Sequence, residues 1–294
     1  MTDETFPLFD AHMHFSHAYL DHVLASYELY GVAGGINLWL PGFHGSSDFA
    51  SPFEEFLSAL TERGVRQFVS FYWPNWKAFG WQGEAFVEET CRAMRRYAGL
   101  GCRGLKVWKD LGMFIFHADG KPATMDDPAL EPIWRTAGEL DWTISIHQAD
   151  PSPSFPKLAR TGLSREDIYR RRDRVLAAHP EIRFILCHNA NDIESVAKWA
   201  ALLDRFPHCL ADMGRDPERY DDRAAVREFL EAYADRIMLG CDLTMPDGRP
   251  PDDPWTLEHV YRPWRRRLLG FGLSDDALGK IAWGNGHRLF LSGG

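Results

Sequence analysis

The sequence predicts an α/β fold, a (β/α)8 TIM barrel that forms a single domain over residues 1–294. Short apolar runs alternate with longer amphipathic segments along the whole chain, and there are eight of these runs. A length of 294 residues lies in the range in which such barrels form one domain. A doubly wound open sheet is the main alternative. It would lead us to expect a glycine-rich phosphate turn after the first strand, where this chain has Asp10-Ala11-His12-Met13-His14.

The expected strands are apolar runs of five to eight residues that end in polar or glycine-rich turns. They cover residues 8–15, 34–40, 67–73, 104–108, 143–147, 183–188, 209–213 and 237–241. The helices expected between them have apolar residues at helical spacing, and several end near glycine or proline. They cover residues 51–63, 83–99, 130–140, 166–179, 193–206 and 223–234.

The composition is that of an ordinary globular protein of the size of an enzyme. A formal net charge of −9 with a pI near 5.7 argues against binding to nucleic acid or to an anionic membrane surface. No run approaches the roughly 18 to 20 apolar residues of a membrane-spanning helix, and the acidic N-terminus lacks the basic region of a signal peptide. The five cysteines are scattered, without a CxxC pair, which fits a reducing compartment. We therefore expect a cytoplasmic protein that acts on a small molecule. The sequence leaves the oligomeric state open, and a homodimer is one alternative.

Metal-ligating side chains gather at the expected strand ends, and in a parallel barrel the carboxyl ends of the strands line the active-site mouth. Those ends carry His12, His14, Lys106, His147, His188 and Asp242. On a strand, His12 and His14 point to one face while Ala11 and Met13 point away. Imidazole and carboxylate ligands suit zinc, manganese or iron, and three or four of them with an open position make a catalytic site.

This ordered set of residues resembles the amidohydrolase superfamily. The opening Phe9-Asp10-Ala11-His12-Met13-His14 and the late segment from Lys280 to Phe290 carry a narrower resemblance. They resemble the amidohydrolase-related group (amidohydrolase 2), which includes metal-dependent hydrolases, lactonases and decarboxylases. The resemblance extends over nearly the whole chain.

The resemblance implies a metal site and assigns its ligands. One divalent ion is then held by His12, His14, His147 and Asp242, and we expect zinc in preference to manganese or iron. In mononuclear relatives, the histidine on strand six, here His188, stands beside the metal-bound water and acts as a base or an electrophile.

Lys106 and His188 decide whether a second ion is expected. In binuclear relatives His188 ligates the second ion, and a carbamylated lysine, here Lys106, bridges the two. This is the less favoured alternative. A plain Lys106 would instead pair with Asp10 or with a substrate anion, because an unpaired buried lysine is costly.

Two reactions share these residues. We expect a metal-dependent hydrolase that cuts an amide or lactone bond in a small acidic or aromatic molecule, by attack of a metal-bound hydroxide. Asp242 would act as the proton shuttle with His188 assisting, and Asp10 would orient one of the strand-one histidines. The alternative is a metal-dependent nonoxidative decarboxylase of an aromatic or unsaturated carboxylic acid. A barrel that only binds a partner is disfavoured, because an unused cluster of imidazoles and a carboxylate confers no obvious stability.

Further polar and aromatic residues near the strand ends are expected to bind the substrate. They are Arg215, Trp39, Trp73, Asn75, Trp108, Lys109, Gln148 and Asn189. The guanidinium of Arg215 matches a carboxylate in two-point geometry, and a surface pair with Asp212 or Asp216 is the alternative. The three tryptophans are expected to form pocket walls.

Overall fold

The computed structural model describes residues 6–15, 20–39, 50–150, 154–190, 195–214, 222–245 and 257–292. Within them, nine strands form one parallel sheet. In chain order they are β1 (Leu8–Phe15), β2 (Val32–Leu38), β3 (Phe68–Tyr72), β4 (Gly104–Val107), β5 (Thr143–Ile146), β6 (Phe184–Leu186), β7 (Cys209–Asp212), β8 (Ile237–Met238) and β9 (Leu243–Met245). Hydrogen-bonded neighbours follow the order β8-β7-β6-β5-β4-β3-β2-β1-β9. The predicted barrel of eight parallel strands is confirmed, with the eighth strand in two pieces.

The barrel closes at the break between β8 and β9. β8 pairs with β7 and β9 pairs with β1, and between these pairings the Ala11 amide donates to the Leu239 carbonyl at 2.8 Å. The sequence predicts one strand over residues 237–241. The strand is interrupted after Met238, and the interruption contains Asp242 with a φ of 51°, which lies outside the β region.

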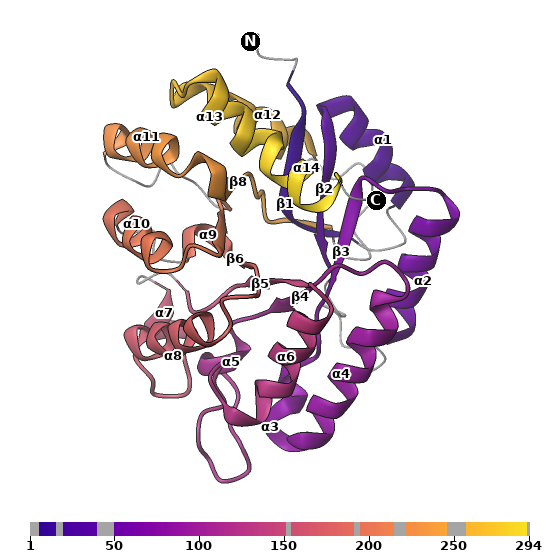
Figure 1. The fold of residues 1–294 in the computed structure, drawn as a ribbon, viewed down its shortest axis with the longest axis vertical. Helices are drawn as coiled ribbons and strands as arrows, with labels where there is room; N and C mark the ends of the chain where they lie inside the picture. Colours follow the sequence, from indigo (N-terminus) through magenta and orange to yellow (C-terminus); the bar gives the residue numbers. More distant parts are fainter. Residues whose placement is uncertain are drawn as a thin grey trace.

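Helices surround the sheet in a ring that follows the chain order (Figure 1). The longer ones are α1 (Leu20–Tyr30), α2 (Ala50–Glu62), α4 (Glu84–Ala98), α6 (Glu131–Glu139), α8 (Arg165–Ala178), α10 (Val196–Arg205), α11 (Arg223–Ala232) and α12 (Leu257–Gly270). The shorter ones are α3 (Phe79–Gln82), α5 (Asp110–Met113), α7 (Phe155–Leu158), α9 (Cys187–Ala190), α13 (Asp275–Gly279), the π-helical η6 (Lys280–Gly284) and α14 (Asn285–Phe290). All six helices expected from the sequence are present. None of the helices described is long and apolar enough to cross a membrane.

A β-bulge in β1 sets the direction of its histidines. Asp10 lies opposite Gly35 of β2 and Met13 lies opposite Asn37, so three steps along β1 match two along β2. Ala11 belongs to the cluster inside the barrel, whereas Met13 belongs to the core between the sheet and the helices. The expected alternation is therefore wrong for Ala11, because the extra residue turns the side chains that follow it back to the interior.

The amino end of the barrel is closed by the C-terminal segment. The interior cluster combines Phe9 of β1 with apolar residues of β2, β3, β6, β7 and β8. The Phe9 ring stacks on Phe290 of α14, with the ring centroids 6.0 Å apart. The buried Asn285 side chain donates to the carbonyls of Ala234 and Ile237, which ties α14 to the start of β8.

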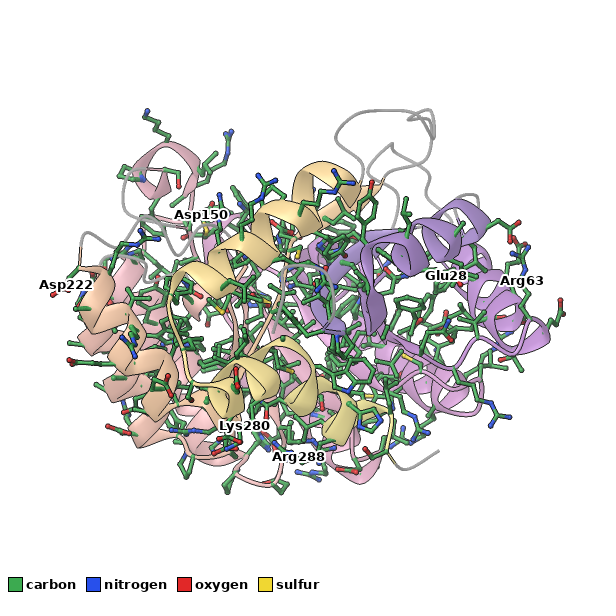
Figure 2. The ribbon with its side chains drawn as sticks, turned by 90° about the horizontal axis from the view of Figure 1, so that it is seen from above. Glu28, Arg63, Asp150, Asp222, Lys280 and Arg288 are labelled. Carbon is green, nitrogen blue, oxygen red and sulfur yellow. The ribbon has the colours of Figure 1, made fainter. Side chains whose placement is uncertain are left out.

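The two ends of the barrel therefore have different roles. Figure 2 shows Lys280 and Arg288 of the C-terminal segment at one end of the molecule, and Asp150, which follows β5, at the other. Because the strands present their carboxyl ends on the Asp150 side, the functional site is expected there.

Gly286 provides a test of how the C-terminal segment closes the amino end of the barrel. A Cβ built on Gly286 would lie 2.1 Å from the Phe9 ring, whereas one on Gly279 would meet nothing within 4 Å. We expect Gly286→Ala to lower the free energy of unfolding by about 1–3 kcal/mol, because overpacking displaces the ring. Gly279→Ala is the control and should leave stability unchanged or slightly raised. Urea unfolding measures the stability of both variants. Equal stabilities would contradict the tight packing of Gly286 against Phe9.

Candidate metal centre

Two imidazoles and one carboxylate converge at the carboxyl end of the barrel. The Nε2 atoms of His12 and His14 lie 3.4 Å and 3.3 Å from Oδ1 of Asp242. The three ligand atoms all lie within 4.8 Å of one another. Both histidines are buried, and the Asp242 side chain is 19% exposed, so the cluster is reached from the barrel mouth.

Each of these histidines is fixed by a hydrogen bond at its other ring nitrogen. Nδ1 of His14 donates to the Leu38 carbonyl at 2.7 Å, and Nδ1 of His12 donates to Oδ2 of Asp212 at 2.9 Å. Both contacts leave Nε2 facing Asp242 with its lone pair available. Partners of this kind commonly orient metal-ligating imidazoles.

Asp10 supports the bulge and not an imidazole. Its Oδ1 accepts the backbone N–H groups of His12 and Cys241, and its Oδ2 accepts the hydroxyl of Tyr261 on α12. Burial raises the pKa of Asp10 to about 6, although these three hydrogen bonds lower it. The expectation that Asp10 orients a strand-one histidine is wrong: it holds the His12 backbone, and Asp212 holds the ring.

His188 lies in a left-handed turn directly after β6. His188, Asn189 and Ala190 have φ values of 53°, 57° and 59°, a conformation that costs roughly 1–2 kcal/mol per residue outside glycine. Oδ1 of Asp212 accepts the backbone N–H of His188 at 2.8 Å and that of Gly214 at 2.9 Å. The turn ends the strand earlier than expected and directs Nε2 of His188 toward Asp242, 3.8 Å from its Oδ2.

His147 lies at the same mouth but outside the converging group of ligand atoms. Its ring packs edge-on against His188, with the centroids 4.7 Å apart, and its Nε2 contacts Oδ1 of Asp150 at 3.4 Å. Both oxygens of Asp150 also accept hydrogen bonds from Nζ of Lys109, at 2.7 and 2.9 Å. Burial lowers the pKa of His147 to about 4. Burial raises the pKa of Asp150, but His147 and Lys109 outweigh it and bring the pKa to about 2.

Lys106 is buried inside the barrel beneath these residues. Its Nζ contacts Sγ of Cys187 at 3.0 Å and Oγ of Ser145 at 3.4 Å, and no ion pair with Asp10 or any other acid is present among the described residues. Burial raises the pKa of the Cys187 thiol to about 12. Cys187, His12 and Asp212 form a second close group, but the Lys106 ammonium and the hydrogen bonds of Asp212 make that group unsuited to a cation.

The rings of Trp73, which is buried, and Trp108, which is half-buried, form an aromatic wall next to His14. The ring centroids of His14 and Trp73 are 5.8 Å apart, and those of Trp73 and Trp108 are 5.5 Å apart. Nζ of Lys109 lies 5.4 Å from the Trp108 ring centroid. Three residues expected at the substrate site therefore lie together, next to the metal-ligand cluster.

The other residues expected to bind substrate are placed differently. Trp39 packs against Phe53 and Phe56 in the core between the sheet and α2. Asn75 precedes a 3-10 turn, and its carbonyl accepts the Ala78 N–H.

Gln148 and Asn189 are buried beside the expected ligands, and Arg215 lies outside the described residues. The side chain of Gln148 donates to the Leu111 carbonyl, so it supports the loop after β4. The contact of Asp212 with the His12 ring was not predicted from the sequence. A charged residue on the interior face of a buried strand was the available signal.

The ionisation of the cluster suits a divalent cation. Burial lowers the pKa of His12 and lowers that of His188 well below its usual value, so both rings are neutral at pH 7. Burial raises the pKa of Asp242, but contacts with His14, His12 and His188 keep it well below its usual value. For His12 and Asp242, a neutral imidazole and an ionised carboxylate are the ligand forms that a divalent metal requires.

Solved structures with the same fold include several aromatic-acid decarboxylases. A 2,6-dihydroxybenzoate decarboxylase from Rhizobium is 18% identical, with a TM-score of 0.62 over 97% of this chain and 99% of that one. A dihydroxybenzoic acid decarboxylase from Polaromonas sp., with bound manganese and 2-nitroresorcinol, is 16% identical, with a TM-score of 0.62 over 97% of both chains. A TIM-barrel protein from Bordetella bronchiseptica is 15% identical, with a TM-score of 0.65 over 97% of this chain and 98% of that one.

A search of curated protein sequences found no match. The sequence model of the amidohydrolase family matches residues 9–291, which is nearly the whole chain and leaves out only Leu8 of the strands described. The resemblance noted in the sequence is therefore confirmed, and the chain is an enzyme that belongs to the amidohydrolase family.

Proposed function

We propose that this enzyme is a metal-dependent nonoxidative decarboxylase of an aromatic carboxylic acid. The observation that supports it best is the indole wall of Trp73 and Trp108 directly beside the converging ligands, since such a wall suits a flat ring. The likeness in fold to several aromatic-acid decarboxylases adds support.

The residues that would hold one divalent ion are His12, His14 and Asp242, and His147 would be the fourth if its ring exchanged its contact with Asp150 for the ion. Manganese is the ion to test first, because it is bound in a decarboxylase of this fold, and zinc is the next. When bound, such an ion supplies positive charge that attracts the substrate carboxylate and a neighbouring hydroxyl.

The chain's own residues would handle the substrate and the proton. In decarboxylation the bond from the ring to the carboxylate carbon breaks and its electron pair stays on the ring carbon. That carbon then takes up a proton as carbon dioxide leaves. Asp242 is the proposed proton-transfer residue: its carboxylate would take a proton from the substrate hydroxyl beside the leaving carboxylate and pass it to the ring carbon, and solvent would return a proton to that oxygen. His188 would assist, because it faces Asp242 at 3.8 Å next to the aromatic wall. Lys109 would hold an anionic group of the substrate over Trp108.

Hydrolysis of an amide or lactone is the second candidate. Oδ1 of Asp242 faces His12 and His14 while its Oδ2 faces His188, so the carboxylate is placed to pass a proton from an attacking water to a leaving group. A panel of hydroxybenzoates, lactones and amides, assayed with Mn²⁺ for carbon dioxide and for acid production, separates the two. Carbon dioxide from an aromatic acid is the expected result. Acid production without carbon dioxide would favour hydrolysis.

Loss of a proposed ligand should abolish tight metal binding. Elemental analysis after dialysis against Mn²⁺-free buffer should find about one ion per chain in the wild type and almost none in His12→Ala or His14→Ala. His287→Ala is the matched control, because His287 is an exposed histidine on α14 at the other end of the barrel. A His12→Ala protein that keeps a full complement of ion would remove this residue from the site.

Lys109 should determine affinity for anionic substrates. We expect Lys109→Met to raise KM for an aromatic carboxylate about tenfold, which corresponds to roughly 1.4 kcal/mol, with a smaller effect on kcat. Lys121→Met is the control, because the Lys121 side chain is 80% exposed and pairs with Asp119. Metal content is measured in parallel, since Lys109 shares Asp150 with His147. An unchanged KM in Lys109→Met would rule out this role.

A further inference from the structure

We infer that Asp212 is a positioning residue that fixes the tautomer of His12 and so makes Nε2 of His12 a metal ligand. This inference rests on the proposed metal site. Asp212 is on β7 and His12 is on β1, so the contact joins strands that are not neighbours in the sheet.

The tautomer follows from the contact between the two side chains. Asp212 is fully buried, and its Oδ2 lies 2.9 Å from Nδ1 of His12. Its other oxygen, Oδ1, already accepts two backbone N–H groups, so the side chain is held as a carboxylate that accepts hydrogen bonds. Oδ2 then accepts from His12 as well, which puts the His12 proton on Nδ1. Nε2 is then unprotonated and faces Asp242.

The second oxygen of Asp212 prevents the carboxylate from turning. Oδ1 accepts the N–H groups of His188 and Gly214, which are both backbone donors with fixed positions. An asparagine in this place would keep its oxygen on those two donors and present its NH2 group to His12. The imidazole would then have to accept at Nδ1 and carry its proton on Nε2, where it blocks a metal.

Asp10 offers a closely matched control on the other side of the same histidine. Its Oδ1 accepts two backbone N–H groups, those of His12 and Cys241, and its Oδ2 faces the hydroxyl of Tyr261. In Asp10→Asn the NH2 group would again replace Oδ2, but a tyrosine hydroxyl can rotate and accept. The two substitutions make the same chemical change at equal burial, and only one of them faces a proposed ligand.

The experiment compares Mn²⁺ affinity in the wild type, Asp212→Asn and Asp10→Asn by competition with a chelator, with circular dichroism as the check on folding. We expect Asp212→Asn to weaken binding by about 10- to 100-fold and Asp10→Asn to stay close to the wild type. Nitrogen-15 NMR of the metal-free wild-type protein reads the His12 tautomer directly, with His12→Ala used for assignment. The proton is expected on Nδ1.

The outcomes distinguish this inference from the proposed function. A wild-type protein that binds no Mn²⁺ and no Zn²⁺ would overturn the metal site, whatever the tautomer. A wild-type protein that binds Mn²⁺, with Asp212→Asn equally tight, would overturn only the role of Asp212. Equal losses in both variants would assign the effect to removal of a buried charge and would also overturn it. If Asp212→Asn does not fold, a proton found on Nε2 in the wild type still overturns the inference.

Discussion

The hydrogen bonds of one buried carboxylate, Asp212, hold the His12 ring and the mouth of the barrel in place, and a second carboxylate, Asp10, joins neighbouring backbone segments. Asp212 accepts one hydrogen bond from β1 and two from the residues that follow β6 and β7. Asp10 accepts one from β1, one from the segment after β8 and one from α12. A buried carboxylate that loses its partners costs several kcal/mol, so these six bonds fix the segments relative to one another. Gly240 reflects the same constraint, because a Cβ there would lie 2.8 Å from Cβ of Asp212.

The hydrogen bonds of Asp212 also support strained backbone. His188, Asn189, Ala149 and Asp242 all have positive φ, and all follow strands at the carboxyl end of the barrel. Each such residue costs free energy that the surrounding contacts must offset, and strain of this kind concentrates at functional sites. The left-handed turn ends the β6 pairing at Leu186, and His188 then faces Asp242 instead of continuing the strand.

The sequence was sufficient for the barrel and for most of the cluster. Apolar runs mark strands that are buried on both faces, and His12, His14 and Asp242 stand at strand ends that any parallel barrel brings together. The features of the site that the sequence could not show depend on the register between strands. The bulge that turns His12 inward exists only as a mismatch between β1 and β2, and the partner of the His12 ring is on β7, 200 residues away. Neither the bulge nor the contact between His12 and Asp212 can be read from a local sequence pattern. Asp10, two residues from His12, was therefore the natural but wrong choice as the partner of its ring.

The ion pair of Lys109 and Asp150 joins the two halves of the mouth. His14, His12, His188 and His147 form a chain of neighbouring rings on one side, and Trp73 and Trp108 form the wall on the other. Asp150 is the connection, because it contacts His147 on the first side and Lys109 beside Trp108 on the second. Under the proposed function, His147 would exchange its contact with Asp150 for the ion, and an anionic substrate would compete with Asp150 for Lys109. Both events would remove a contact of Asp150. The free energies of binding metal and substrate are therefore coupled through this carboxylate and should not be additive.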